Sequence, residues 1–449
     1  MAEASLLGGC LERLDWSPER LAREINRLCG PGTISSKAPY GWLRGSCPRG
    51  RLPQVVAEIL SSRLNEPVRA EALWPSRLRA GGVLLSADDG LDLPWTQNGT
   101  RQCSTLLTGG GAAEQSVPAL LPVAGHSLIG PAVDWLTAPD EQLQARSIGA
   151  EVGPAAVDIL IDRITQLRRL DDLQGGPLVL DWVAQDLHWA ATLVRGGAYD
   201  NQTGVRLHEA LAELAQLAGW VATDLDRVAL AQRYFLTGLR AAHTAGDRLL
   251  GANIVSCLSY QAAWHGADDD ALRLVKVARK GAAGNESGAV QALLATRQAR
   301  AHAKLGDVGG CGRALEEAAA FGSAIDGATD PRWSYWVTPA VLAADAGRAW
   351  LELGRPARAE EYLVRGLEMF GQDQPRNRLL HNASLAEARL AREDVEGAAA
   401  AAHSAMDLSA HLDSQRARAR LRVLHTGFGA RDTSVAREVC GRVEDILSA

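Results

Sequence analysis

Two short motifs in the middle of the chain have residue types that could support chemistry. The run 125–130 (GHSLIG) places Ser127 as in a nucleophile elbow, but the elbow needs glycine two residues after the serine, where Ile129 stands. The three glycines 109–111 could cradle a phosphate, but no Lys-Ser or Lys-Thr pair follows them. Neither motif supports catalysis, so we expect no enzyme, no catalytic residue and no cofactor.

Thiol and metal chemistry is not indicated either. The chain has seven cysteines, which is an odd number, and they are scattered without any C-x-x-C pair. The array of repeats described below contains no H-E-x-x-H motif. We expect reduced, mostly buried thiols and no metal site. The seven positions are Cys10, Cys29, Cys47, Cys103, Cys257, Cys311 and Cys440.

Basic residues near the N-terminus have the clearest chemical potential. Residues 1–80 contain 12 Arg and Lys against 8 Asp and Glu, a net charge of +4, whereas the whole chain has a net charge of −6. The rest of the chain is therefore acidic, with a net charge of −10. This asymmetry allows the N-terminal segment to approach a polyanion such as DNA.

The elements that would position these basic residues follow the order of a helix-turn-helix. Apolar residues at helical spacing predict a first helix that ends near Asp15, and Ser17 caps a second helix that stops at the glycines 30–32. A third helix, capped by Ser35 or Ser36, ends at Gly45. Its leading end would face base edges in the major groove. The predicted DNA contacts are Ser35, Ser36, Lys37 and Tyr40 at that end, with Arg44, Arg49 and Arg51 toward phosphates. A small helical bundle with solvated arginines is the alternative.

The chain beyond residue 153 predicts paired helices in a repeating pattern. Small residues recur where two antiparallel helices would approach, over units near the tetratricopeptide length of roughly 34 residues. Turns fall at Gly306 and Gly354, each between the two helices of a unit. Between residues 79 and 153 no hydrophobic period persists, so a glycine-rich linker and a small packed adapter both remain open.

A repeat array of this kind presents a surface that suits a peptide or a small effector. Arg297 and Arg300 fall on a first helix of a unit and could pair with an anionic group, but we expect each of them on a solvated surface. Aromatic and imidazole side chains could line the same surface. The candidate effector-binding residues are Trp264, Arg297, Arg300, His302, Trp336 and Trp350.

Segments in both halves of the chain resemble one known group of regulators. The run 33–50 (TISSKAPYGWLRGSCPRG) and the segment that contains Leu217-Ala-Gly-Trp220 and Ala231-Gln-Arg-Tyr-Phe235 are similar to actinobacterial Cro/lambda-repressor-type (XRE) helix-turn-helix regulators with tetratricopeptide repeats, of the NsdA type. The resemblance implies a DNA-binding transcriptional regulator of development or secondary metabolism.

The sequence therefore predicts an all-α protein with four parts. Residues 1–78 form the helix-turn-helix domain, 79–153 the linker or adapter, 154–412 the tetratricopeptide-like repeats and 413–449 the capping helices. We expect a cytoplasmic homodimer that binds double-stranded DNA and has no membrane segment, with a small-molecule or peptide effector in the array. The alternative is an interaction scaffold that does not bind specific DNA.

Overall fold

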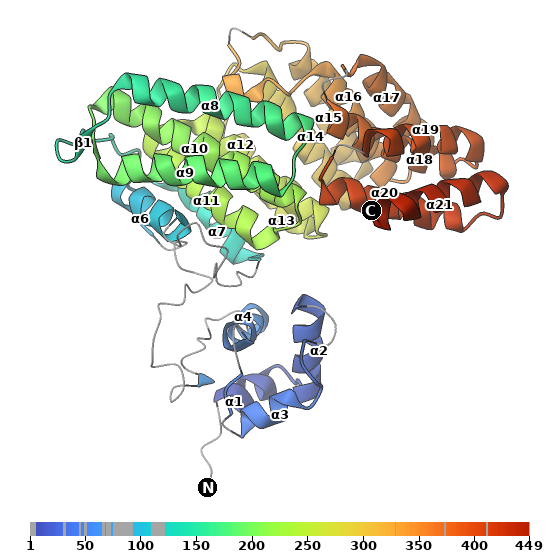
Figure 1. Cartoon of the computed structure of the whole chain (residues 1–449), viewed down its shortest axis with the longest axis horizontal. Helices are drawn as coiled ribbons and strands as arrows, with labels where there is room; N and C mark the ends of the chain where they lie inside the picture. Colours follow the sequence, from blue (N-terminus) through green and yellow to red (C-terminus); the bar gives the residue numbers. More distant parts are fainter. Residues whose placement is uncertain are drawn as a thin grey trace. The chain divides into compact units, whose positions relative to one another are not determined.

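The computed structural model (Figure 1) describes residues 6–29, 33–44, 46–48, 52–64, 68, 73–74, 93–108, 122–327, 329–371, 374–409 and 412–448. The chain divides into two compact units: residues 1–92 with 110–121, and residues 93–109 with 122–449. The expected all-α fold with a solenoid of paired helices is confirmed. None of the helices in the described ranges is long and apolar enough to cross a membrane.

The described part of the N-terminal unit is a small bundle of helices α1 (Leu6–Arg13), α2 (Pro18–Cys29), α3 (Ala38–Leu43) and α4 (Leu52–Leu64). The Ser17 hydroxyl accepts the backbone N–H of the third residue beyond it at 3.3 Å, as predicted for a cap of α2. Apolar residues at helical spacing on these helices meet in one core. That core includes Leu7, Leu11, Leu21, Ile25, Trp42, Val55, Val56 and Leu60.

The start of α3 differs from the prediction. The N-cap position is Lys37, which makes no side-chain capping bond, so neither Ser35 nor Ser36 caps this helix. The reason is a tight turn before the helix, in which the Ala38 N–H donates to the carbonyl of Ser35 at 3.1 Å. Backbone groups therefore satisfy the first turn, and α3 is only six residues long.

The second unit consists mainly of consecutive helix pairs, which lie side by side in chain order in Figure 1. From α10 to α19, each first helix packs on the second helix of its own pair and on the first helix of the next pair. The helices are α8 (Pro154–Leu173), α9 (Pro177–Gly196), α10 (Asn201–Asp224), α11 (Val228–Ala245), α12 (Arg248–Trp264), α13 (Asp268–Gly281), α14 (Gly288–Lys304), α15 (Val308–Gly322), α16 (Pro339–Glu352), α17 (Pro356–Met369), α18 (Pro375–Leu390), α19 (Val395–Ser409), α20 (Gln415–Gly429) and α21 (Ser434–Ser448).

The same turn joins the two helices of all five pairs from α10 to α19. In each turn, one of the residues between the two helices has a left-handed backbone. The backbone N–H of the residue that follows it donates to the carbonyl five residues earlier, at 2.9–3.0 Å. The sequence predicts two of these turns from their glycines. The left-handed residues are Asp226, Gly266, Gly306, Gly354 and Glu393, with φ of 60°, 78°, 73°, 67° and 63°.

Two helices from the segment before residue 154 pack on this array. Helix α6 (Gln97–Thr108) lies on α9 and α11, and α7 (His126–Thr137) lies on α11 and α13. Trp135 of α7 is only 2% exposed. A Cβ atom would lie 2.6 Å from its ring at Gly251 and 2.2 Å at Gly281. Helices α12 and α13 therefore need glycine at these two positions to admit the indole.

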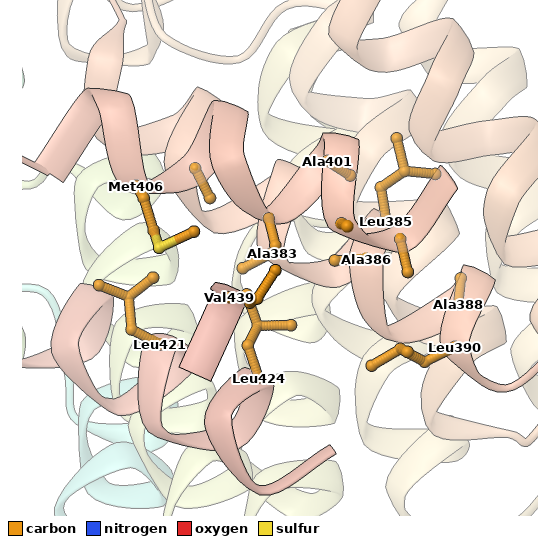
Figure 2. Packing of buried hydrophobic residues seen from close by; sticks show 14 of the residues in the cluster. Ala383, Leu385, Ala386, Ala388, Leu390, Ala401, Met406, Leu421, Leu424 and Val439 are labelled. Carbon is orange, nitrogen blue, oxygen red and sulfur yellow. The ribbon is translucent and has the colours of Figure 1, made fainter. Parts of the chain in front are cut away.

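Short strands and a C-terminal apolar cluster complete the unit. Strand β1 (Ala150–Glu151) pairs in parallel with β2 (Gly197–Ala198), which joins the segment before α8 to the end of α9. At the C-terminal end of the unit, apolar side chains of α18 to α21 pack together, as Figure 2 shows. They include Ala383, Leu385 and Ala386 of α18, Ala401 and Met406 of α19, Leu421 and Leu424 of α20, and Val439 of α21.

Candidate functional site

The first candidate site is the surface around the start of α3 in the N-terminal unit. Five of the predicted DNA contacts lie there with exposed side chains: Ser35, Ser36, Lys37, Tyr40 and Arg44. The other two predicted contacts, Arg49 and Arg51, lie outside the described residues. The five predicted contacts that the structure describes thus lie together on α3 and the turn before it.

A side chain of α2 holds the turn that leads to this surface. The Asn26 amide donates to the Ile34 carbonyl and accepts the Ile34 N–H, both at 2.9 Å. The Tyr40 hydroxyl donates to the carboxylate of Glu19, and this hydrogen bond lowers the pKa of Glu19. Asn26 therefore fixes the turn to α2, and Tyr40 links α3 to the start of α2. Sequence reasoning did not identify Asn26, because one polar residue on an amphipathic helix gives no distinctive signal.

Helix α2 carries a basic stripe beside this surface. Arg20, Arg23 and Arg27 are exposed and are spaced by three and four residues, so they lie on one side of the helix. Arg20 stacks on the ring of Trp16 at 5.1 Å, and Arg27 pairs with Glu24 at 2.8 Å. The sequence shows these charges, but their common side of the helix becomes significant only once α2 is placed next to α3.

The second candidate site lies among the first helices of the array, around Tyr260 of α12. This tyrosine is 5% exposed. The Cζ atoms of Arg297 and Arg300 of α14 are 4.5 and 4.6 Å from the centroid of its ring. Nη1 of Arg416 of α20 donates to the Tyr260 hydroxyl at 3.0 Å. Guanidinium groups from two helices therefore enclose one buried phenol.

Six arginines of these helices form a group that we call the arginine cluster, and most of them pair with carboxylates. Arg297 is 3.4 Å from Asp345, and Arg300 is 3.3 Å from Glu352, and both side chains are buried, so the expected solvated surface is wrong for both. Arg420 pairs with Glu387. The cluster consists of Arg297, Arg300, Arg348, Arg376, Arg416 and Arg420.

Two members of the arginine cluster join the beginning of the array to its end. Arg376 of α18 donates to both carboxylate oxygens of Asp171 of α8 at 2.9 and 2.6 Å. Arg416 of α20 donates through Nε to Asp224 of α10 at 2.5 Å. All four side chains are buried. Partners that are 205 and 192 residues apart in the chain thus hold α8 and α10 to α18 and α20.

The arginines change the acidity of the tyrosine that they surround. Burial alone would raise the pKa of the Tyr260 phenol. The guanidinium groups of Arg416, Arg300, Arg348 and Arg297 outweigh burial and lower that pKa to about 7. A phenolate in this position would supply a negative charge to the arginine cluster near neutral pH.

The structure gathers four of the six candidate effector-binding residues around Tyr260. Arg297 and Arg300 contact its ring, Trp264 stacks on it with centroids 6.3 Å apart, and Arg297 also lies 5.7 Å from the ring of Trp336. The other two have different surroundings. His302 lies 2.9 Å from Asp307 at the end of α14, and Trp350 is stacked by Arg358 of α17. Sequence reasoning missed the other cluster arginines, whose signal was a charged residue on a first helix otherwise rich in small residues.

The structure describes one of the two motifs in the middle of the chain that could have supported chemistry. Ser127 is exposed in the first turn of α7, and the glycines 109–111 lie outside the described residues. None of the seven cysteines forms a disulfide. Within the ranges that the structure describes, no group of three or more His, Cys, Asp or Glu side chains is arranged to hold a metal ion.

One comparison with known proteins bears on the N-terminal unit. Residues 7–73 match the family model of the SP15 N-terminal domain. This range begins in α1, extends past the end of α4 and does not reach the array. No curated protein matches the chain.

Proposed function

We propose that the protein is a DNA-binding transcriptional regulator. The observation that carries the proposal is the exposed leading end of α3, where Ser35, Ser36 and Lys37 lie on a turn that Asn26 holds against α2. Short polar side chains and one lysine at the start of the second helix of a pair suit contacts to base edges in the major groove.

The basic stripe of α2 gives this surface a way to bind the DNA backbone. Arg20, Arg23 and Arg27, with Arg44 at the end of α3, would contact phosphates and fix the position of α3. The carboxylate of Glu19 lies on the same side and would oppose phosphate binding. Glu19→Gln should therefore strengthen DNA binding, in contrast to the loss of an arginine.

In this proposal the array, which we assign to the tetratricopeptide type, controls the N-terminal unit. Such readers commonly bind two half-sites as two-fold dimers. We propose a cytoplasmic homodimer in which a signal bound by the array shifts the equilibrium between two arrangements of the DNA-binding units. The developmental or secondary-metabolism role rests on the sequence resemblance alone.

The test is capture of genomic DNA fragments, followed by gel shift on any enriched site at two salt concentrations. Lys37→Ala with Arg44→Ala should abolish enrichment at discrete sites. Lys276→Ala with Lys280→Ala removes the same charge from exposed positions of α13 and should preserve it. Affinity of the intact protein should fall steeply with salt, by a log–log slope of about 0.9 for each phosphate contact. No enrichment at low salt, or equal loss in both variants, would exclude the proposal.

A specific observation favours the interaction scaffold as a second candidate. Helix α9 exposes Leu178, Trp182 and Trp189 at 49%, 49% and 43%, and their spacing places them on one side of the helix. Exposed tryptophans are frequent anchors of protein interfaces. Trp182→Ala with Trp189→Ala should lower self-association or partner binding in sedimentation experiments if this surface is used. Unchanged sedimentation would remove this support.

A further inference from the structure

Arg348 of α16 differs from the rest of the arginine cluster. Its side chain is buried, with 6% exposure, and its guanidinium lies 5.5 Å from the ring of Trp264. It makes no hydrogen bond or ion pair with any residue in the described part of the chain. Burial, and the positive charges of Arg300 and Arg420, lower its pKa, although the negative charges of Tyr260 and Glu352 act in the opposite direction. Every other arginine of the cluster has a carboxylate partner.

The groups around Arg348 offer further unused hydrogen-bond donors. Arg300 and Arg420 both act electrostatically on it, and the Nε atoms of both are buried without a partner in the described residues. His381 of α18 lies within the electrostatic reach of all three arginines. Burial lowers its pKa to about 4, so the imidazole is neutral at pH 7, and its buried Nδ1, a donor in the tautomer that carries the proton there, also has no partner in the described residues. An acceptor with several oxygens would satisfy these donors together.

A buried guanidinium without a directly bonded carboxylate is costly, because Tyr260 and Glu352, neither of which is bonded to it, offset only part of its desolvation. A bound anion would supply the direct partner that Arg348 lacks. We propose that Arg348, with Arg300 and Arg420, binds the oxoanion group, a carboxylate or a phosphate, of a small molecule. The planar guanidinium suits both groups, since each offers two oxygens to its two parallel N–H donors.

The surroundings indicate how such a ligand would reach the site and be held. The side chains of Arg420 and Glu352 beside it are 14% and 20% exposed, so this part of the cluster reaches solvent. Trp264 is half-buried and would contact the part of the molecule next to the oxoanion. The site gives a ligand class to the sensing role proposed above. It rests on that proposal only for its effect on DNA, since binding to the array can be measured separately.

The experiment measures anion binding to the full-length protein without DNA. Thermal unfolding and calorimetry are performed at pH 6.5 with sodium phosphate or sodium acetate, each against sodium chloride at equal ionic strength. We expect one of the two anions to raise the unfolding temperature above chloride. Arg348→Met should weaken that anion about tenfold or more, because a charge-assisted hydrogen bond is lost. Arg358→Met is the matched control, since this exposed arginine of α17 also stacks on a tryptophan.

Phosphate alone stabilising the protein would indicate a phosphorylated ligand, and acetate alone a carboxylic acid. Either supports the site, provided that the effect disappears in Arg348→Met and persists in Arg358→Met. Arg348→Lys, which keeps the charge and loses the planar pair of donors, should show weakened binding and serves if Arg348→Met does not fold. Stabilisation that is equal in the Arg348 variants and the wild type, or absent from the wild type, overturns the proposal. DNA binding would remain unaffected by that result.

Discussion

The ion pairs that join the two ends of the array make a quantitative prediction. Arg416→Met would leave Asp224 buried without its main partner; burial raises the pKa of Asp224, but Arg416 and Arg376 together hold it below its ordinary value. Breaking a buried pair from one side costs about 3–5 kcal/mol, because the remaining charge is uncompensated. Arg376 lies 3.8 Å from the second oxygen of Asp224 and compensates in part. We therefore expect a loss of about 3 kcal/mol in the free energy of unfolding.

Urea unfolding followed by far-ultraviolet circular dichroism measures this loss. Asp224→Asn removes the other partner, and the double variant removes both charges, so its loss should be smaller than the sum of the single losses. The control is Arg437→Met, whose pair with Asp432 has side chains 67% and 96% exposed, and which should leave stability unchanged. Hydrogen exchange should increase first in α10 and α20, the helices that this pair joins. Additive single effects, or an Arg416→Met loss no larger than that of the control, would refute the reasoning.

Three further predictions concern other parts of the molecule. Tyr260 should titrate near pH 7 by absorbance at 295 nm, and Tyr260→Phe should remove this transition. Because the pKa in the folded protein lies below the ordinary value of 10, the contribution to stability is full above pH 10 and is lost as the pH falls through about 7. This contribution is at most about 4 kcal/mol, and urea unfolding of the wild type and of Tyr260→Phe at several pH values measures it. Gly281→Ala places a Cβ atom 2.2 Å from the Trp135 ring and should destabilise the protein by about 1–3 kcal/mol in thermal unfolding. Gly312→Ala, with open space around it in α15, should be neutral or stabilising, and equal effects would contradict the packing argument. Asn26→Ala loses two hydrogen bonds at about 1 kcal/mol each and should speed hydrogen exchange in α3; unchanged exchange would show that the turn is held otherwise.

The segment before residue 154 shows where reading by hydrophobic period fails. Helix α6 buries small and polar residues, which contact the array through hydrogen bonds instead of apolar surface. The Thr100 hydroxyl bonds that of Thr244 at 2.7 Å, and Cys103 contacts the Thr237 hydroxyl at 3.2 Å. Helix α7 has Pro131 in its interior, a residue that usually ends a helix. Helix α6 therefore lacks the apolar pattern from which a buried helix is recognised, and in α7 Pro131 interrupts the helical spacing that Leu128, Ala132 and Trp135 otherwise keep.

The paired helices and their turns could be read from the chain because the interactions that form them are local. Small residues at helical spacing, and glycines such as Gly306 and Gly354, act within one unit of roughly 34 residues. The exposed residues at the start of α3 are likewise close in sequence. The arrangement of Asp171, Asp224 and Tyr260 against α18 and α20 is different, because it depends on the rotation that accumulates over successive pairs. The repeating sequence predicts each pair of helices but not the total rotation of the array, so it does not indicate which distant residues meet. Only the tertiary structure pairs Asp171 and Asp224 with arginines and leaves Arg348 without a carboxylate partner.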